Sequence, residues 1–303
     1  MAKLKLYEQL QKEGRVIPAI EDTLFKKIIT EHKDYLGIIL EDILPLTKEA
    51  VMEGQFFSTE IPSSNIFRKS NRLDLVLKSG SYKLNLEANR KITIKLLLRN
   101  EAHFSGMIYQ DYNDKENLDY NTNYCQVNFN GQNYLKKKLV ITLTYHDKIL
   151  DVEEKRLSKI HLNLGIALKK YYNKEKLSRF EKALVLLLLE EKEKIKKLVE
   201  GDKILEKVAK DIMSYSEARA IVDAYEAEII ERNIEEYSRE YEIKKATEKA
   251  TKKATKKALK EGRQEGIQQS KIEMAKEFLK NGVSKKIVVK STGLAEDEIE
   301  KLL

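Results

Sequence analysis

The chain has 303 residues, of which 42% are hydrophobic and 35% are charged, and its formal net charge is +8. This length allows one large core with an appended segment, or two domains. Cys125 is the single cysteine, which excludes an internal disulfide framework and a cysteine-based zinc site, and we interpret it as a small core or strand residue.

The N-terminal part of the sequence predicts a cytoplasmic protein with an early helical segment. Its first residues, MAKLKLYEQLQKEGR, lack the apolar stretch of a secretory signal, and the longest apolar run (183–189) is too short to span a bilayer. Residues 19–44 have helical periodicity with a break near Lys33–Asp34, and Pro45 ends this segment.

Residues 72–90, RLDLVLKSGSYKLNLEANR, predict two short strands joined by a tight turn, because apolar and polar residues alternate on both sides of a Ser-Gly-Ser sequence. With Ser79-Gly80 as the loop, Asp74 faces Asn85 and is a diagonal neighbour of Glu87, within about 7–8 Å at the backbone. A three-residue loop would place the two acids on opposite faces. Two carboxylates on one face of a hairpin suit a metal-dependent nuclease.

The middle of the chain predicts one more helix and two more strands. Residues 100–112 carry apolar and aromatic side chains at helical spacing, and residues 123–130 and 137–145 alternate as strands do. Helix, strands, helix and strands in this order predict a small α/β core over residues 1–165. From about residue 157 the pattern is helical, and residues 166–242 form a predicted helical region with charged outer faces.

Most of the positive charge lies in one C-terminal stretch. Residues 244–271 hold ten Lys or Arg and three Glu, which leaves the rest of the chain at about +1. Within residues 243–270, alanines recur every four residues and two glycines continue the step, so this stripe winds around a helix and is not a heptad seam. We interpret the stretch as a Lys-rich linker helix, although its small residues also permit close helix approach and self-association.

Residues 271–303 predict three short helices. Gly282 ends the first, Ser284 caps the second, and Gly293 closes the second before a final helix from Glu296. Two helices around a Thr-Gly-Leu turn have the size of a helix-turn-helix, and a trihelical cap or oligomerisation unit fits the pattern equally well.

The sequence contains no phosphate-binding Gly-rich loop, no dinucleotide fingerprint and no nucleophile elbow. The four histidines, His32, His103, His146 and His161, form no HxxxH or HxH pair, and we interpret them as ordinary surface or helix-face residues. Carboxylates are therefore the candidate chemistry.

Several segments together resemble the PD-(D/E)xK nuclease fold and, more narrowly, the PD-(D/E)xK nuclease family transposases, which are related to recombination-promoting nucleases. The matching segments span nearly the whole length and are residues 22–28, 72–90, 99–112, 124–130 and 260–303. The resemblance implies a restriction-endonuclease-like α/β core, with a mixed sheet flanked by helices, followed by an α-helical C-terminal region.

The resemblance also implies that Asp74 and Glu87 hold Mg²⁺, with the main-chain carbonyl of Ala88 as a further ligand, for hydrolysis of a DNA phosphodiester. Asn89 occupies the place of the motif lysine. Its amide can orient a water molecule but carries no charge, and the family more usually has Gln where the lysine is absent. Two solvated strand acids, paired with Arg72, Arg90 or Arg99, are the alternative explanation of the two carboxylates.

Five further residues are secondary candidates. Asp22, or its neighbour Glu21, would add an acid from the first helix, although a carboxylate at a helix N-terminus also stabilises the helix dipole. Arg99, Tyr109 and Gln126 lie in matching segments as candidate positioning groups, and the last two fit core positions equally well.

Three functions are consistent with these observations. The first is a Mg²⁺-dependent DNA endonuclease with a basic, DNA-binding C-terminal region. The second is a catalytically inactive DNA-binding or recombination-accessory protein with the same fold, which Asn89 favours. The third is a helical scaffold that forms a homo-oligomer through its C-terminal helices. No membrane partner is expected.

Overall fold

The computed structural model describes residues 6–57, 60–61, 71–72, 74–113, 119–134, 138–147, 149 and 151–302. Leu73, in the first predicted hairpin strand, and the side chain of Arg72 lie outside the described residues. The chain divides into two compact units, Met1–Ile230 and Glu231–Leu303.

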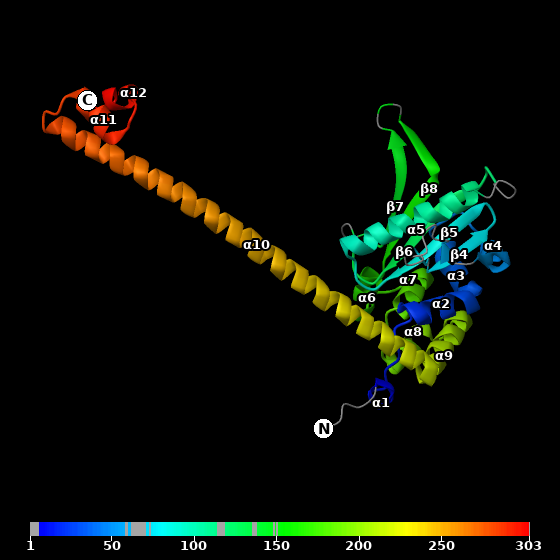
Figure 1. Cartoon of the computed structure of the whole chain (residues 1–303). Helices are drawn as coiled ribbons and strands as arrows, with labels where there is room; N and C mark the ends of the chain where they lie inside the picture. Colours follow the sequence, from blue (N-terminus) through cyan, green and yellow to red (C-terminus); the bar gives the residue numbers. More distant parts are fainter. Residues whose placement is uncertain are drawn as a thin grey trace. The chain divides into compact units, whose positions relative to one another are not determined.

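A six-stranded mixed sheet lies at the centre of the first unit, with strand order β1-β4-β5-β6-β8-β7 (Figure 1). The strands are β1 (Gln55–Phe57), β4 (Leu75–Ser79), β5 (Tyr82–Asn89), β6 (Asn123–Asn130), β7 (Val140–Asp147) and β8 (Val152–Asn163). β6 is parallel to both β5 and β8, and the other neighbours are antiparallel. A separate antiparallel pair joins β2 (Glu60–Ile61) and β3 (Asn71–Arg72).

Helices cover both faces of this sheet. Their bounds are α1 (Leu6–Lys12), α2 (Asp22–Glu31), α3 (Lys33–Leu40), α4 (Lys48–Glu53), α5 (Ile94–Asn113), α6 (Leu164–Tyr172), α7 (Arg179–Leu186), α8 (Lys192–Val199) and α9 (Lys203–Glu217). α5 connects the parallel strands β5 and β6 and covers one face, while α2, α3 and α7 pack on the other (Figure 1). The two consecutive helices α2 and α3 meet at His32, one residue from the predicted break.

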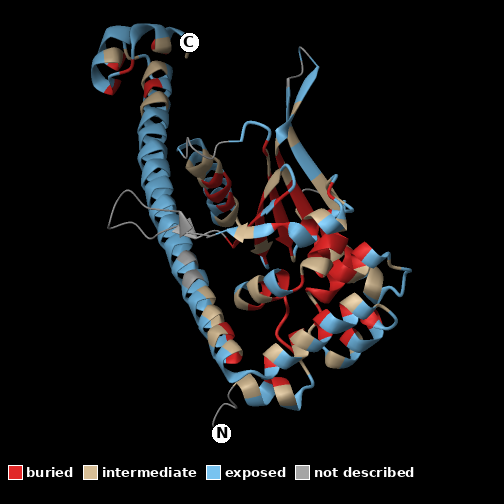
Figure 2. Ribbon diagram, turned by 90° about the vertical axis from the view of Figure 1, so that its right-hand side faces the viewer, coloured by how far each residue is buried: buried red, intermediate tan, exposed pale blue. Residues whose placement is uncertain are grey.

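The two faces of the sheet differ in chemistry. Buried residues of the strands lie at the centre of the first unit (Figure 2). On the face toward α2 their apolar side chains belong to the main core, where the Phe25 and Phe129 rings meet edge to face at 5.1 Å. Because side chains alternate along a strand, the opposite face carries the polar positions of the same strands. These buried polar residues beneath α5 are Asn85, Glu87, Asn89, Gln126, Asn128, Asn130 and His161.

The predicted hairpin is present, but its register differs from the predicted one. The loop is Gly80-Ser81, one residue later than predicted, and its glycine has φ +54°, a conformation that other residues seldom adopt. The loop still has an even number of residues, so the two acids keep one face. Since Leu75 pairs with Leu86, the register aligns Asp74 directly opposite Glu87 and not diagonally.

Two predictions for residues 152–217 are wrong. β8 extends to residue 163, where a helix was expected from about residue 157; Ile160 and Leu162 are buried at the two-residue spacing of a strand. The helices α6 to α9 share the hydrophobic core of the sheet, so the boundary expected at residue 165 does not separate two cores.

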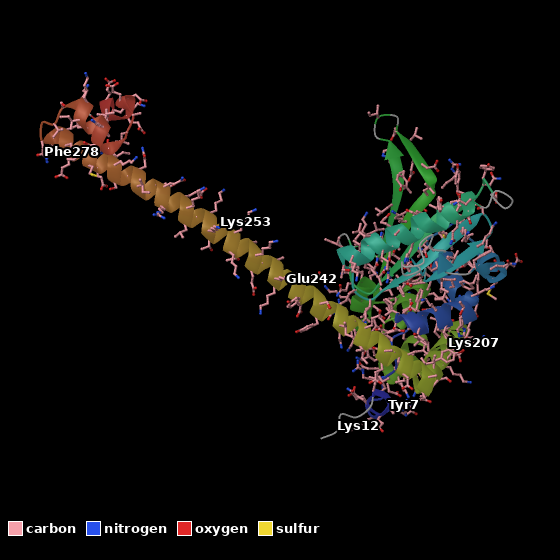
Figure 3. The ribbon with its side chains drawn as sticks, in the orientation of Figure 1. Tyr7, Lys12, Lys207, Glu242, Lys253 and Phe278 are labelled. Atoms are coloured by element: carbon pink, nitrogen blue, oxygen red, sulfur yellow. The ribbon has the colours of Figure 1, made fainter. Side chains whose placement is uncertain are left out.

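The C-terminal region is dominated by α10 (Arg219–Lys280), a single helix of 62 residues that runs through the boundaries expected at residues 243 and 271. Figure 3 shows Glu242 and Lys253 projecting from this helix, and both are exposed. No helix in the described part of the chain is both long and apolar enough to cross a membrane.

The last turns of α10 pack with α11 (Lys285–Thr292) and α12 (Glu296–Glu300) around a small core of Ala275, Val288, Leu294 and Ile299. Gly282 and Gly293, with φ +78° and +67°, follow α10 and α11, and Ser284 is the N-terminal flanking residue of α11. These boundaries agree with the sequence, except that the first predicted helix is the end of α10.

Candidate active site

Asp74 and Glu87 come together at the end of the β4–β5 hairpin. Asp74 is 8% exposed and Glu87 is fully buried. Burial, and then the neighbouring charge of Glu87, raise the pKa of Asp74 well above its ordinary value. The Asp74 Oδ2 atom accepts a hydrogen bond of 2.9 Å from the main-chain amide of Ala88, which fixes this carboxylate against β5. The two acids are therefore close enough to act on each other electrostatically.

One oxygen of Glu87 is held by the fold and the other is not. Oε1 accepts a hydrogen bond of 3.0 Å from Asn85 Nδ2 and lies 2.9 Å from Nδ1 of His103, on α5. A carboxylate only accepts hydrogen bonds, so this contact requires the proton of His103 on Nδ1. Oε2 is buried and has no hydrogen bond within the described part of the chain, and the guanidinium of Arg99 lies 3.8 Å from it.

Asp74 has a similar division between its two oxygens. Its Oδ1 lies 3.9 Å from Nζ of Lys26, on α2, and makes no hydrogen bond within the described residues. The same Nζ forms a 2.8 Å ion pair with Asp22, one turn earlier in the helix. Asp22 therefore lies beside the site, whereas the neighbouring Glu21 forms an ion pair with Arg90.

Asn89 is buried in a network of amides. Its Nδ2 donates to Asn130 Oδ1 at 3.1 Å, and its Oδ1 accepts from Asn100 Nδ2 at 3.0 Å. Asn100 also donates to Asn128 Oδ1, at 3.1 Å. Both ends of the Asn89 amide are thus engaged by neighbouring strands and by α5.

The other sequence candidates take different positions. Gln126 is buried and donates to the main-chain carbonyl of Asn100 at 2.7 Å, so it is a core-facing residue that connects β6 to α5. Tyr109 is exposed on α5. Arg99 reaches Glu87, and Arg72, offered as a partner for the acids, has its side chain outside the described residues.

The donor set fits a small, hard cation. The described residues contain no group of three or more His, Cys, Asp or Glu side chains placed to hold a metal ion. Asp74 Oδ1 and Glu87 Oε2 are nevertheless two carboxylate oxygens that accept no hydrogen bond from the described residues. Mg²⁺ binds oxygen and retains several waters, so one or two carboxylates together with substrate phosphate satisfy it.

Sequence reasoning missed His103 and Lys26. The interpretation of the histidines as surface or helix-face residues is confirmed for the exposed His146 and for His103, which lies on the buried face of α5. It is wrong for His32, buried between α2 and α3, and for His161, buried on β8. Burial lowers the pKa of His161 to about 4. The sequence does contain a signal for the polar face, since polar residues recur at every second position in residues 85–89 and 126–130.

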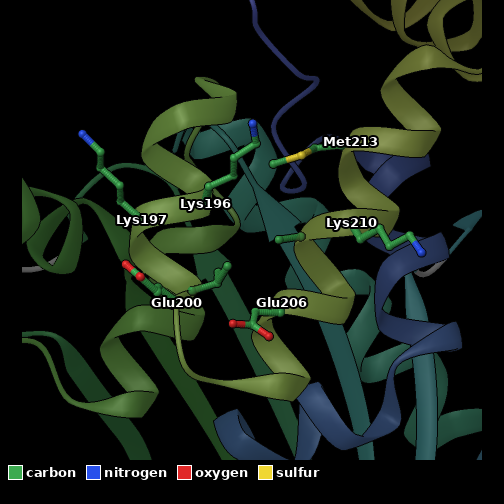
Figure 4. A pocket seen from close by; sticks show the side chains of 8 residues that line it. Lys196, Lys197, Glu200, Glu206, Lys210 and Met213 are labelled. Atoms are coloured by element: carbon green, nitrogen blue, oxygen red, sulfur yellow. The ribbon is translucent and has the colours of Figure 1, made fainter.

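The described residues also line two cavities away from Asp74 and Glu87. A cavity of about 240 Å³ beneath α5 is lined in part by Asn100, Gln126, Asn128 and His161, and so belongs to the same polar face. A larger one of about 510 Å³ lies between α8 and α9, where Lys196, Lys197, Glu200, Glu206, Lys210 and Met213 line it (Figure 4). Its lining mixes both charges and includes no residue of the candidate site.

Comparison with known proteins identifies the C-terminal region. Residues 268–303 match the sequence model of the Rpn/YhgA-like nuclease family, C-terminal HTH domain. No curated protein and no solved structure matches the chain. The matched stretch contains the end of α10 with α11 and α12, so the comparison favours the helix-turn-helix over a simple trihelical cap.

Proposed function

We propose that this protein is a Mg²⁺-dependent DNA endonuclease of the transposase or recombination-promoting type, with Asp74 and Glu87 as its metal ligands. One observation carries the proposal: each acid has one oxygen fixed by the fold and one oxygen without a hydrogen bond from the described residues, 3.9 Å and 3.8 Å from a cationic side chain. The mixed sheet flanked by helices and the C-terminal match to a nuclease family support it.

In this proposal the residues of the site bind and orient. Asp74 and Glu87, with the carbonyl of Ala88, hold the ion. Asn85 and His103 fix the Glu87 carboxylate through its Oε1. When bound, Mg²⁺ polarises the phosphodiester and lowers the pKa of the attacking water. Asn89 connects β5 to β6 and α5 and thereby positions Glu87 on its strand.

The C-terminal region supplies affinity for DNA. The helix-turn-helix is proposed to contact the duplex, and the ten Lys or Arg of residues 244–271 attract phosphates independently of sequence. Self-association through the same helices remains a prediction. Sedimentation of the full chain, compared with a chain ending before Lys244, tests it: an oligomer that survives the truncation is not formed by the alanine stripe.

The test of the endonuclease is plasmid nicking in Mg²⁺ by the wild type, Asp74→Ala and Glu87→Ala. We expect nicking by the wild type and a loss of at least about 10²-fold in both variants, because each removes a ligand of the ion. Equal nicking by all three proteins excludes the site.

The engaged, neutral Asn89 favours a second candidate, an inactive DNA-binding or recombination-accessory protein. This candidate predicts salt-dependent DNA binding with no increase in melting temperature on addition of Mg²⁺. The endonuclease predicts such an increase, since a ligand that binds only the folded state stabilises it.

A further inference from the structure

We propose that Lys26 supplies the positive charge that position 89 does not provide. The inference rests on the proposed endonuclease function and adds a residue to the same site. Its starting point is chemical: attack on a phosphodiester increases the negative charge at the phosphoryl oxygens, and fixed cations beside the metal stabilise that charge.

Asn89 is excluded from this role by its contacts as well as by its neutrality. Its Nδ2 and Oδ1 are both hydrogen-bonded inside the amide network with Asn130 and Asn100, and the side chain is buried. To turn toward a substrate, it would have to break two buried hydrogen bonds and leave their partners unsatisfied, which is unfavourable.

Two Lys or Arg side chains lie within 4 Å of the acids in the described part of the chain, Lys26 and Arg99. Arg99 is an exposed residue of α5 that approaches the fully buried Glu87, at 3.8 Å. Lys26 stands beside Asp74, at the more exposed of the two acids.

The backbone of Lys26 is held rigidly by the core, whereas its ammonium group is accessible to solvent. The neighbouring residues Phe25, Ile28 and Ile29 are fully buried in the main core, so α2 cannot shift without disrupting that core. The side chain is 34% exposed, and Asp22 holds its ammonium group at 2.8 Å. A rigid helix thus presents a solvent-accessible ammonium group beside the Asp74 oxygen that has no hydrogen bond.

The neighbouring residue Lys27 offers a matched control. Its side chain is also 34% exposed, and it forms an ion pair with an acid of the same helix, Glu31, at 2.6 Å. It points away from the acids, toward the ring of Tyr215. Lys26→Met and Lys27→Met therefore remove the same charge from adjacent positions on α2.

The experiment uses the full chain and two readouts: the Mg²⁺ concentration at the midpoint of the thermal shift, and the single-turnover nicking rate at saturating Mg²⁺. For Lys26→Met we expect a rate lower by about 10²–10³-fold, with a midpoint equal to or below that of the wild type, since the cation competing for Asp74 is removed. Lys27→Met should leave both readouts unchanged, and Lys26→Arg should retain most of the rate.

Three results overturn the inference. Nicking by Lys26→Met at the wild-type rate shows that the charge is not needed. If Lys26→Met has a higher Mg²⁺ midpoint but nicks at the wild-type rate at saturating Mg²⁺, Lys26 only affects binding of the metal. A rate loss in Arg99→Met and not in Lys26→Met assigns the charge to Arg99. In all three the wild type nicks DNA, so they differ from failure of the proposed function, in which the wild type does not.

Discussion

Burial makes Asp74 an unfavourable anion in the metal-free protein. The pKa of its carboxyl is raised on folding, so the folded state binds this proton more tightly than the unfolded state. The stability that this proton contributes is fully present below the unfolded pKa of about 3.9 and is lost as the pH rises through the raised, folded pKa. Near neutral pH the unprotonated Asp74 therefore opposes folding until a cation neutralises it.

We accordingly predict that Asp74→Asn raises the melting temperature in EDTA at pH 7–8 and abolishes the stabilisation by Mg²⁺. For a unit of this size, each kcal/mol gained corresponds to about 2–4 °C. Differential scanning calorimetry with and without Mg²⁺ measures both effects. Asp151→Asn, at an exposed position, is the control and should change neither. A lower melting temperature for Asp74→Asn in EDTA contradicts the assignment.

In the proposed metal site, His103 would act on the ion only through Glu87. Because it holds the Oε1 atom at 2.9 Å, its removal frees the carboxylate to rotate within a buried site. Loss of a side chain that orients a metal ligand reduces metal affinity by about 10–100-fold. We predict that His103→Ala raises the Mg²⁺ midpoint of the thermal shift by that factor and that His146→Ala, at an exposed position, does not. Equal midpoints for the two variants would show that Glu87 needs no such support.

At the scale of the elements, the geometry of the site depends on the turn between β4 and β5. Gly80 has φ +54°, and a Cβ atom added there meets only Leu46, at 3.8 Å. The strain of a substitution is therefore in the backbone and not in packing. We predict that Gly80→Ala lowers the free energy of unfolding by about 1–2 kcal/mol. Urea denaturation followed by circular dichroism measures the change.

The control for this prediction is Gly262→Ala, in α10. Apart from the adjacent residues and the backbone of the helix itself, no atom of the described residues lies within 4 Å of the added Cβ atom. The helix conformation suits alanine, so we expect a gain of up to about 1 kcal/mol in the stability of that helix. A lower free energy of unfolding for Gly80→Ala, together with a higher stability for Gly262→Ala, supports the turn geometry. Equal stability of Gly80→Ala and the wild type would contradict it.

The elements differ in how well the sequence predicts them. β6 occupies the predicted residues 123–130, because its side chains alternate clearly and both faces are covered. β8 was missed because α6 follows its last residue directly, with no loop between the two elements. The helical spacing from Leu164 onward therefore masks the alternation of Ile160 and Leu162. Propensity alone does not separate two such adjoining elements.

The candidate site was predictable only in part. Asp74 and Glu87 follow from local alternation within one hairpin, although the turn type, and hence the register, depends on the conformation of a single glycine. Lys26 and His103 reach the acids from α2 and α5, which the tertiary fold brings to the hairpin. No pattern of residue spacing in the sequence indicates that Lys26 and His103 lie next to these acids.

At the scale of the whole molecule, charge is separated along the sequence. Residues 244–271 carry a net +7 out of the +8 of the chain. Each lysine that contacts a phosphate contributes about −0.9 to the slope of log K against log salt for duplex DNA. We predict that Lys252→Gln with Lys253→Gln makes this slope shallower by up to about 1.8, measured by fluorescence anisotropy with a labelled duplex.

The control for the slope is the double variant Lys207→Gln and Lys210→Gln, which removes the same charge from α9. If the slope is unchanged in this control and shallower in the α10 variant, the phosphate contacts lie on residues 244–271. Equal slopes for both variants and the wild type would show that residues 244–271 do not contact DNA.

The most direct test of the account is a crystal structure of the full chain soaked in Mn²⁺, a redox-stable substitute for Mg²⁺ that gives anomalous scattering. We expect an anomalous peak bound by Asp74 Oδ1 and Glu87 Oε2, with the Asp74 Oδ2 and Glu87 Oε1 contacts to Ala88, Asn85 and His103 retained. In Asp74→Asn crystals the peak should be absent. Mn²⁺ bound elsewhere, or Glu87 still buried against α5 without a metal at saturating Mn²⁺, would contradict it.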